Sequence, residues 1–358
     1  MPNPFPGPFP GPRISRLARA LSALGALAAV WFGTAAAAAP PADNGAVILM
    51  YHRFGENAFP STNIRIEQFE AHIRELTSGR FTVLPLPEIV RALADDTPLP
   101  ERAVAITVDD AFRSVYTEAW PRLRAAGLPF TIFVATAPLD EKRPGYMSWD
   151  ELREMAASGI VTVGNHSVHH GHMAALPDAE ARAEIAQAAA RFERELGSRP
   201  SLFAYPYGEY GRALRDAAAE AGFDAAFGQH SGAVARGADR YALPRYALNE
   251  TYGEAERFRL VVNSLPLPVR DVTPADPLIR AGGNPPLYGF TVAEDIARLD
   301  AINCFTSGNE ITIERLGDRR IEVRLARPYA PGRARINCTV PGPDGRWRWL
   351  GTLFTVLP

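Results

Sequence analysis

The chain has 358 residues, of which 47% are hydrophobic and 22% are charged, so it has enough apolar side chains for a large core and one smaller domain. Its net charge is -2 at pH 7 and its arginines are scattered along the sequence. This excludes the basic field or basic stripe with which a protein binds nucleic acid.

Residues 1–39 have the pattern of a secretory signal peptide. Arg13, Arg16 and Arg19 precede an apolar stretch at residues 21–32, and small residues follow at 34–39. This order, with Ala-x-Ala cleavage sites at its end, is typical of exported proteins. An uncleaved membrane anchor is the alternative, but the apolar stretch is shorter than the roughly 20 residues that cross a bilayer. We therefore predict a periplasmic or secreted protein.

Residues 45–264 alternate predicted strands and helices. Apolar runs predict strands at residues 47–50, 81–84, 103–108, 130–134, 160–163 and 202–205. Amphipathic patterns and their end signals predict helices at residues 68–76, 86–94, 115–126, 148–158, 178–196 and 212–221. Such strands predict an α/β fold with a parallel sheet, either a (β/α) barrel or a doubly wound sheet. Polar motifs after several strands favour the barrel, where strand ends converge on one face.

The composition changes after residue 264. Four prolines at residues 265–277 predict a Pro-rich linker. In residues 278–358, alternating polar and apolar residues with turn signals predict a small all-β sandwich-like domain. This domain has no concentration of ionisable catalytic side chains, so we interpret it as an accessory domain or a stabilising cap. An oxidising compartment permits disulfides, and Cys304 and Cys338 are predicted to form one.

The strand at residues 103–108 is followed by Asp109 and Asp110. Because successive strand residues point to opposite faces, one carboxylate can bind a metal ion while the other faces a substrate. Acidic residues after strands also often cap helices, so the pair alone is a weak signal.

Four of the seven histidines lie within residues 166–172. His166 and His170 are four residues apart, so one helical turn would put both imidazoles on one face. Two imidazoles and one carboxylate suit zinc and similar divalent ions, with positions left open for water. A surface histidine run without a metal is the alternative. His169 and His172 are expected only to line the loop.

A third motif, Phe-Ala-Tyr-Pro-Tyr-Gly at residues 203–208, takes an apolar strand into a rigid turn. Backbone N–H groups at such a turn can stabilise an oxyanion. Turns of this composition are also commonly structural.

Taken in order, these motifs resemble those of the NodB-like polysaccharide deacetylases, carbohydrate esterase family 4. Thr-Val-Asp-Asp-Ala at residues 107–111 is similar to the family's Thr-Phe-Asp-Asp-Gly, and His-Ser-Val-His-His at residues 166–170 matches its His-Ser/Thr-x-x-His. Residues 204–208 resemble its Arg-Pro-Pro-Tyr-Gly turn. Met-Tyr-His-Arg at residues 50–53 and Met-Ser-Trp at residues 147–149 are similar to the branch that contains biofilm poly-N-acetylglucosamine deacetylases. The resemblance covers residues 46–249.

The resemblance implies a distorted (β/α) barrel and a hydrolase that removes N-acetyl groups from a polysaccharide. Asp109 would be the general base, and the backbone N–H of Tyr207 would stabilise the oxyanion. Asp110, His166 and His170 would bind a divalent metal, Zn first and Co or Ni as alternatives. The β domain would then dock to the glycan or the cell envelope. An esterase of O-acetylated polysaccharide or xylan, and a catalytically weak barrel that only binds glycan, are the alternatives.

Two positions depart from the family pattern. Ala204 stands where the family has an arginine that orients the base, and Arg245 stands where its Leu-x-His motif supplies the acid. We hypothesise that Arg245 pairs with Asp109 in place of the missing arginine. His52 and His230 are then the candidates for the general acid, and both also fit structural roles.

Overall fold

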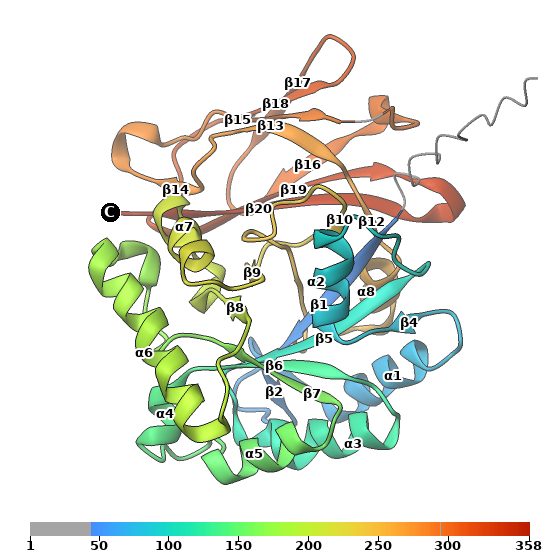
Figure 1. Cartoon of the computed structure of the whole chain (residues 1–358). Coiled ribbons are helices and arrows are strands. Elements are labelled where there is room, and N and C mark those ends of the chain that lie inside the picture. Colours follow the sequence, from blue (N-terminus) through green and yellow to red (C-terminus); the bar gives the residue numbers. More distant parts are fainter. Residues whose placement is uncertain (1–43, 294) are drawn as a thin grey trace, which may run out of the picture. The chain divides into compact units, whose positions relative to one another are not determined.

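The computed structural model of the protein describes residues 44–293 and 295–358, and the predicted signal peptide lies outside the described part. Six parallel strands form the centre of a nine-stranded curled sheet (Figure 1). In spatial order these strands are β1 (Gly45–Tyr51), β5 (Ala103–Asp109), β6 (Phe130–Val134), β7 (Val161–Asn165), β8 (Leu202–Ala204) and β9 (Ala225–Phe227). The parallel sheet predicted from the apolar runs is therefore present.

Three short strands complete this sheet. β10 (Ala233–Ala235) pairs antiparallel with β1, β11 (Tyr246–Ala247) pairs with β1 in parallel, and β4 (Thr82–Val83) pairs with β5. A separate two-stranded sheet joins β2 (Arg53–Phe54) to β3 (Asn63–Ile64).

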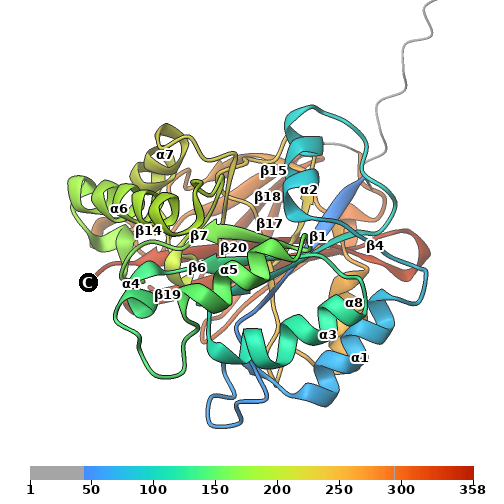
Figure 2. The ribbon, with the colours of Figure 1, turned by 60° about the horizontal axis from the view of Figure 1, so that its bottom comes forward.

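Helices cover the outside of the curled sheet (Figure 2). They are α1 (Ile66–Leu76), α2 (Leu86–Ala94), α3 (Trp120–Ala125), α4 (Thr136–Asp140), α5 (Trp149–Ala157), α6 (Asp178–Leu196), α7 (Arg212–Glu220) and α8 (Ala255–Val262). A π-helical turn, Val115–Ala119, precedes α3 within the predicted helix at residues 115–126. Within the described ranges, no helix has both the length and the apolar character needed to cross a membrane.

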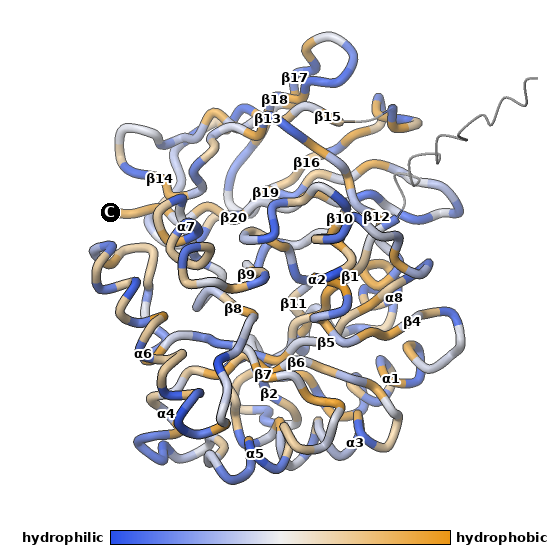
Figure 3. Tube along the Cα trace, viewed as in Figure 1, coloured by the Kyte–Doolittle hydropathy of each residue, from blue (hydrophilic) through white to orange (hydrophobic). Residues whose placement is uncertain are grey.

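The ends of these helices follow from local sequence. Ser148 caps α5, because its Oγ accepts a hydrogen bond from the Glu151 N–H while the Glu151 carboxylate accepts one from the Ser148 N–H. Gly197 ends α6 in the left-handed conformation, at φ 76°, which costs glycine little. Hydrophobic and hydrophilic residues alternate along much of the trace (Figure 3).

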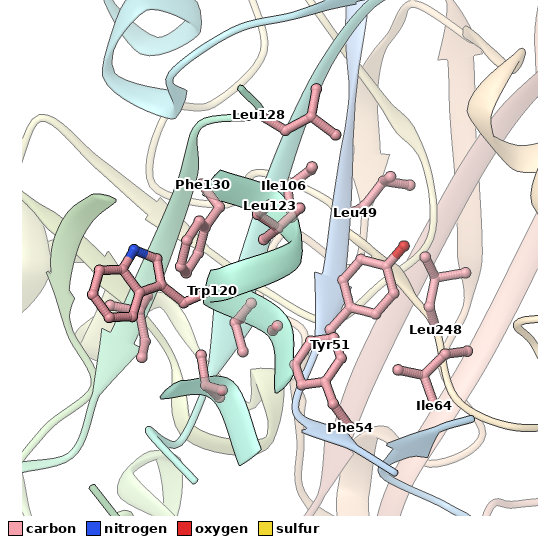
Figure 4. Packing of buried hydrophobic residues seen from close by; sticks show 14 of the residues in the cluster. Leu49, Tyr51, Phe54, Ile64, Ile106, Trp120, Leu123, Leu128, Phe130 and Leu248 are labelled. Atoms are coloured by element: carbon pink, nitrogen blue, oxygen red, sulfur yellow. The ribbon is translucent and has the colours of Figure 1, made fainter. Parts of the chain in front are cut away.

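The main core lies between the sheet and its helices. Leu49, Ile106 and Phe130 of three neighbouring strands belong to one buried cluster with Trp120 and Leu123 of α3 (Figure 4). Complete burial of a side chain of this size contributes about 1.5 to 3 kcal/mol. The cluster therefore fixes the sheet on which the polar motifs stand.

Residues 243–248 occupy the gap between the last parallel strand and the first. The Leu243 N–H donates to the carbonyl of Ala226 in β9, and the Leu248 N–H donates to the carbonyl of Met50 in β1. Leu243 also forms a parallel bridge with Phe227. This segment thereby links the two ends of the sheet, and it carries Arg245 at its middle.

The C-terminal residues form two further sheets (Figure 1). One contains β12 (Leu265–Pro266), β14 (Leu278–Ile279), β16 (Asn303–Thr306), β19 (Gly332–Pro341) and β20 (Trp347–Val356). The other contains β13 (Val269–Thr273), β15 (Tyr288–Val292), β17 (Ile311–Leu316) and β18 (Arg320–Leu325). Their facing side chains, among them Phe290, Val323, Ile336 and Phe354, form one apolar core. The predicted sandwich-like, all-β region is confirmed.

The stretch predicted as a linker differs from expectation. Residues 265–277 include β12, which pairs with β20, and β13, which pairs with β15. β12 lies at the edge of its sheet, where a proline that lacks an N–H is tolerated. Of the four prolines, Pro266 therefore lies in an edge strand, and the other three lie between strands.

The predicted disulfide is present. Cys304 of β16 and Cys338 of β19 lie directly opposite each other and are bonded. Both are buried in the core of the two C-terminal sheets.

Candidate active site

The two aspartates after β5 separate at a sharp turn of the backbone. Asp109 is the last residue of the strand and is completely buried. Asp110 and Ala111 follow at φ 76° and 53°, a left-handed conformation that is costly for residues other than glycine. The Asp110 N–H donates to the carbonyl of Phe133 in the neighbouring strand and holds this turn. The carboxylates of Asp109 and Asp110 therefore contact different side chains.

Asp109 is held by Arg245 in the arrangement that we hypothesised from sequence. The guanidinium donates to Oδ1 at 2.7 Å and to Oδ2 at 2.8 Å, and both side chains are fully buried. Arg245 also donates to the carbonyl of Gly228 at 2.9 Å and to the hydroxyl of Thr107 at 3.2 Å. Because the Arg245 guanidinium donates to four acceptors, its orientation is fixed, and it in turn fixes the orientation of the Asp109 carboxylate.

Asp109 remains ionised in this setting. Burial by itself raises the pKa of the carboxyl, but the charges of Arg245 and His166 and the hydrogen bonds from Arg245 outweigh it, so the pKa lies below its ordinary value. Each carboxylate oxygen has a second lone pair that Arg245 does not use.

The two ligand-type histidines converge in a way that differs from the predicted helical turn. Residues 166–170 form an irregular loop after β7, in which Ser167 and His170 have φ values of 70° and 56°. The side chain of Asn165 accepts from the Ser167 N–H, and the Ser167 hydroxyl accepts from the His170 N–H. These two bonds fold the loop back, and the imidazole centroids lie 4.8 Å apart.

Asp110, His166 and His170 meet as a possible metal site. One ligand atom from each lies within 4.8 Å of the others, and Asp110 Oδ1 is 3.5 Å from His166 Nε2 and 3.1 Å from His170 Nε2. Asp110 Oδ1 and His166 Nε2 are buried without a hydrogen-bond partner among the described residues. Buried polar atoms that lack a partner are costly, and a divalent cation would satisfy both. The residues therefore fit a metal ion.

The pKa values of Asp110, His166 and His170 also favour the binding of a cation. Burial lowers the pKa of His166 to about 4, so its imidazole is neutral at pH 7. Its Nδ1 lies 2.7 Å from the carbonyl of Ala204, which leaves Nε2 free to face Asp110. Burial lowers the pKa of His170, but the neighbouring Asp110 carboxylate outweighs this and raises it. The pKa of Asp110 is held low because both imidazoles and His52 oppose the effect of burial.

Tyr207 lies in a turn that several distant side chains support. Its backbone is at φ 59°, its ring stacks on His172 at 4.4 Å, and it contacts the edge of His170 at 4.5 Å. Arg333 of β19 donates to the Tyr207 carbonyl at 3.4 Å and lies 3.8 Å from Glu209. Glu209 in turn contacts His172 at 2.7 Å. His172, which we expected only to line the loop, thus supports this turn, whereas His169 contacts Glu184.

A cavity of about 760 Å³ opens over the triad. Asp110, His170 and Tyr207 line it on the barrel side together with His52, whereas Arg333, Arg335 and Trp349 line it from the C-terminal sheet. His230 does not line this cavity. Burial lowers the pKa of His230 to about 4, and its ring lies near Tyr210. The structure therefore separates the two candidate acids: His52 faces the cavity, and His230 lies behind it.

Sequence reasoning missed the supporting residues that come from far along the chain. Arg333 and Glu209 have no motif around them, and Asn165 and Ser167 act through their hydrogen bonds to the loop backbone. Asn165 and Ser167 carry a weak signal, because short polar side chains beside a histidine motif often fix a turn. Arg333 carries none, because its position depends on the packing of the C-terminal sheet.

Comparisons with known proteins agree with this geometry. Residues 96–226 match the family model described as polysaccharide deacetylase. Asp109, Asp110, His166, His170 and Tyr207 fall inside the matched range. Arg245 and His52 fall outside it. The curled sheet with its helices is also similar to the solved Streptococcus pyogenes deacetylase PplD in complex with acetate, with a TM-score of 0.57 at 19% identity over 61% of this chain and 98% of that one. The predicted fold is thereby confirmed.

Curated relatives match a similar share of the chain. YxkH of Bacillus subtilis is 28% identical over 55% of this chain and 69% of its own length. The poly-beta-1,6-N-acetyl-D-glucosamine N-deacetylase of Escherichia coli is 25% identical over 56% of this chain, but the match spans only 36% of that enzyme. Residues 96–226 are thus similar to the polysaccharide deacetylase family, and the curated relatives that the chain matches include an enzyme named as an N-deacetylase.

Proposed function

We propose that the protein is an exported, metal-dependent hydrolase that removes N-acetyl groups from a polysaccharide containing N-acetylglucosamine. The observation that carries this proposal is the convergence of Asp110, His166 and His170 at one side of the cavity, next to the buried Asp109–Arg245 pair. The name of the Escherichia coli relative supports an N-acetylglucosamine polymer as the substrate class.

The residues that would hold the metal are Asp110, His166 and His170. A divalent ion bound there would lower the pKa of a water molecule and polarise the acetyl carbonyl. Zinc fits two imidazoles and a carboxylate, and cobalt and nickel accept the same ligands. The contact between His166 Nδ1 and the Ala204 carbonyl would keep Nε2 of that imidazole directed at the ion.

Asp109 is proposed as the general base. It is ionised, it directly precedes a metal ligand, and Arg245 fixes its orientation. In the reaction, the oxygen of water attacks the acetyl carbon and Asp109 takes the water proton. The carbon–nitrogen bond then breaks, acetate leaves, and the sugar nitrogen requires a proton.

His52 is proposed as the group that supplies this proton. It lines the cavity beside Asp110 and contributes to the low pKa of that carboxyl. His230 is the poorer donor, because it lies outside the cavity lining and its imidazole is neutral at pH 7. The backbone N–H of Tyr207 is proposed to stabilise the developing oxyanion, at a turn held in its strained conformation by Arg333.

The rest of the cavity suits a sugar polymer. Tyr252 and Phe305 line it from opposite parts of the chain and remain 51% and 44% exposed. Aromatic side chains that line an open cavity present apolar faces on which a ligand can stack. Their apolar faces would stack on the rings of sugar units bound in the cavity.

Export is proposed from the sequence of residues 1–39 and is supported by the disulfide between Cys304 and Cys338, since such bonds persist in oxidising compartments. A role of the C-terminal sheets in docking to the cell envelope has no support in the structure. Those sheets instead supply one wall of the cavity.

The proposal is tested by acetate release. The protein is stripped with a chelator, reloaded with zinc, cobalt or nickel, and incubated with N-acetylglucosamine oligomers. The same oligomers in which the nitrogens are free and the hydroxyls O-acetylated test the esterase alternative. We expect release from the N-acetylated oligomers, loss on chelation, and recovery with metal.

Asp109→Asn should keep the metal and lower kcat by about 10² to 10⁴-fold, the usual contribution of a positioned general base. His169→Ala is the matched control, because His169 contacts Glu184 away from the triad. If the protein binds metal stoichiometrically but releases no acetate from any oligomer, the only alternative left is a catalytically weak barrel that binds glycan.

A further inference from the structure

The cavity over the triad has a charge that differs from that of the whole chain. Three arginines, Arg257, Arg333 and Arg335, line it, and Asp110 is the only carboxylate among its described lining residues. The chain as a whole has a net charge of -2. Since Asp110 is a predicted metal ligand, a bound divalent ion would make the cavity more positive still. The excess of cations is therefore local to this cavity.

Strand geometry explains how two of these arginines reach the cavity. In β19, Ala334, Ile336 and Cys338 point into the apolar core of the C-terminal sheets. Residues that alternate with them point to the opposite face, so Arg333 and Arg335 both face the barrel. The C-terminal sheet thus presents two arginines, Arg333 and Arg335, to the cavity over the metal site.

The three arginines differ in their partners. Arg333 contacts Glu209 and the Tyr207 carbonyl, so it is used in supporting the turn. No carboxylate pairs with Arg257 or Arg335 anywhere in the described parts of the chain, although the guanidinium of Arg257 lies over the Trp349 ring at 4.8 Å. By contrast, Arg348 in β20 donates to the carbonyl of Pro266 in the neighbouring strand β12.

Arg257 and Arg335 are also only partly hydrated. Burial lowers the pKa of each, and the neighbouring Arg333 lowers that of Arg335 further. Tyr252 acts electrostatically on both side chains, and all three residues line the same cavity. Glu209 acts electrostatically on Arg335, but neither Arg257 nor Arg335 forms an ion pair with a carboxylate of the described residues. Partly buried cations that lack such a pair are costly, and an anion bound in the cavity would reduce this cost.

We propose that Arg257 and Arg335 form a subsite for an anionic group, a carboxylate or a phosphate, carried by a sugar of the same polymer whose N-acetyl group lies at the metal site. The substrate would then be an acidic polysaccharide. This inference rests on the proposed function. It distinguishes the chain's substrate from the uncharged polymer after which the Escherichia coli relative is named.

The test compares two oligosaccharides that differ in charge alone. One alternates N-acetylglucosamine with glucuronic acid, and the other is the same molecule with each carboxyl group reduced to a hydroxymethyl group. A phosphodiester-linked N-acetylglucosamine oligomer forms the phosphate arm. Dissociation constants are measured by calorimetry with the zinc-loaded full chain, and acetate release is measured separately. We expect at least one charged oligomer to bind about tenfold or more tightly than its neutral counterpart, in keeping with charge-assisted hydrogen bonds.

Variants then locate the effect. Arg257→Gln and Arg335→Gln should each weaken binding of the charged oligomer about tenfold and leave the neutral one unchanged, whereas Arg335→Lys should retain most of the preference. Arg315→Gln is the matched control, since Arg315 is an exposed arginine of β17 outside the cavity. Unchanged zinc stoichiometry and an unchanged unfolding transition show that each variant is folded.

Equal affinity for the charged and neutral oligomers would overturn the subsite, as would an equal loss for both in Arg335→Gln. Acetate release without charge preference would overturn the subsite and leave the proposed function standing. Charge-selective binding without acetate release from any oligomer would support the anionic subsite and overturn the proposed function.

Discussion

Arg245 donates to both carboxylate oxygens of Asp109 from the segment that links the two ends of the curled sheet. The same residue therefore contributes to the closure of the barrel and to the position of the proposed base. We propose that Arg245 takes the role of the arginine that the family motif places at the position of Ala204. A guanidinium in this place can come from a different strand because the ends of parallel strands converge on one face.

Arg245→Ala should be strongly destabilising. It leaves the Asp109 carboxylate buried without its partner, and loss of one member of a buried ion pair costs about 3 to 5 kcal/mol. The free energy of unfolding by urea measures this, and kcat should fall about 100-fold because the base is no longer held in place. Arg315→Ala, at an exposed position of β17, should change neither quantity. Unchanged activity of Arg245→Ala would show that Asp109 does not depend on this pair.

Removal of a triad ligand should abolish tight metal binding. Asp110→Asn, His166→Ala and His170→Ala each remove one of three donors, a larger loss than the 10 to 100-fold cost of removing an outer hydrogen-bond partner. Zinc affinity measured by competition with a chelator should fall by more than 100-fold, and His169→Ala should bind as the wild type does. Affinity should also fall as the pH drops through the raised pKa of His170, because the ion must displace that proton. A His170→Ala variant with wild-type affinity would contradict the assignment.

The stability of the metal-free protein should depend on pH through its buried histidines. Burial lowers the pKa values of His72, His166 and His230 to about 4. Between pH 6.5 and 4 the unfolded chain binds more protons than the folded one, so the free energy of unfolding decreases as the pH falls through this window. His170 has the opposite sign: its raised pKa stabilises the fold below pH 6.5, and that contribution is lost at higher pH.

The pH dependence of the free energy of unfolding can be tested at His72, which is not part of the metal site. Its ring stacks on Phe258 at 3.8 Å, its Nε2 lies 2.8 Å from the Gly253 carbonyl, and its Nδ1 lies 3.0 Å from the Tyr51 hydroxyl. In His72→Gln the slope of unfolding free energy against pH, measured with urea between pH 5 and 6, should decrease by about 1.4 kcal/mol per pH unit, the value for one proton. The exposed His169→Gln should leave the slope unchanged. An unchanged slope in His72→Gln would mean that this imidazole is protonated in the folded state.

The sequence predicts what is local and misses what depends on distant packing. The apolar runs predict the strands because a parallel sheet buries both faces, and Asp109, Asp110 and His166 stand out because they directly follow such strands. The four-residue spacing of His166 and His170 fits a helix equally well, and only the positive φ of Ser167 and His170 decides for the loop. Arg335 could not be assigned to the site, because nothing near β19 in the sequence indicates that its sheet packs against the barrel.

Gly351 tests whether that packing shapes the cavity. It lies in β20, and a Cβ atom there would be 2.1 Å from the carbonyl oxygen of Ser231 on the barrel side, so the two backbones touch only because residue 351 has no side chain. Gly351→Ala should push β20, which carries Trp349, away from Ser231, and both Trp349 and Ser231 line the cavity. We expect a loss of about 1 to 3 kcal/mol in unfolding free energy, as for other overpacked sites, and a higher KM for oligosaccharides with unchanged zinc stoichiometry. Gly282→Ala, where the added atom meets open space, should have no effect on KM. If Gly351→Ala raised KM no more than Gly282→Ala does, the C-terminal sheet would be a cap on the barrel and not a wall of its substrate cavity.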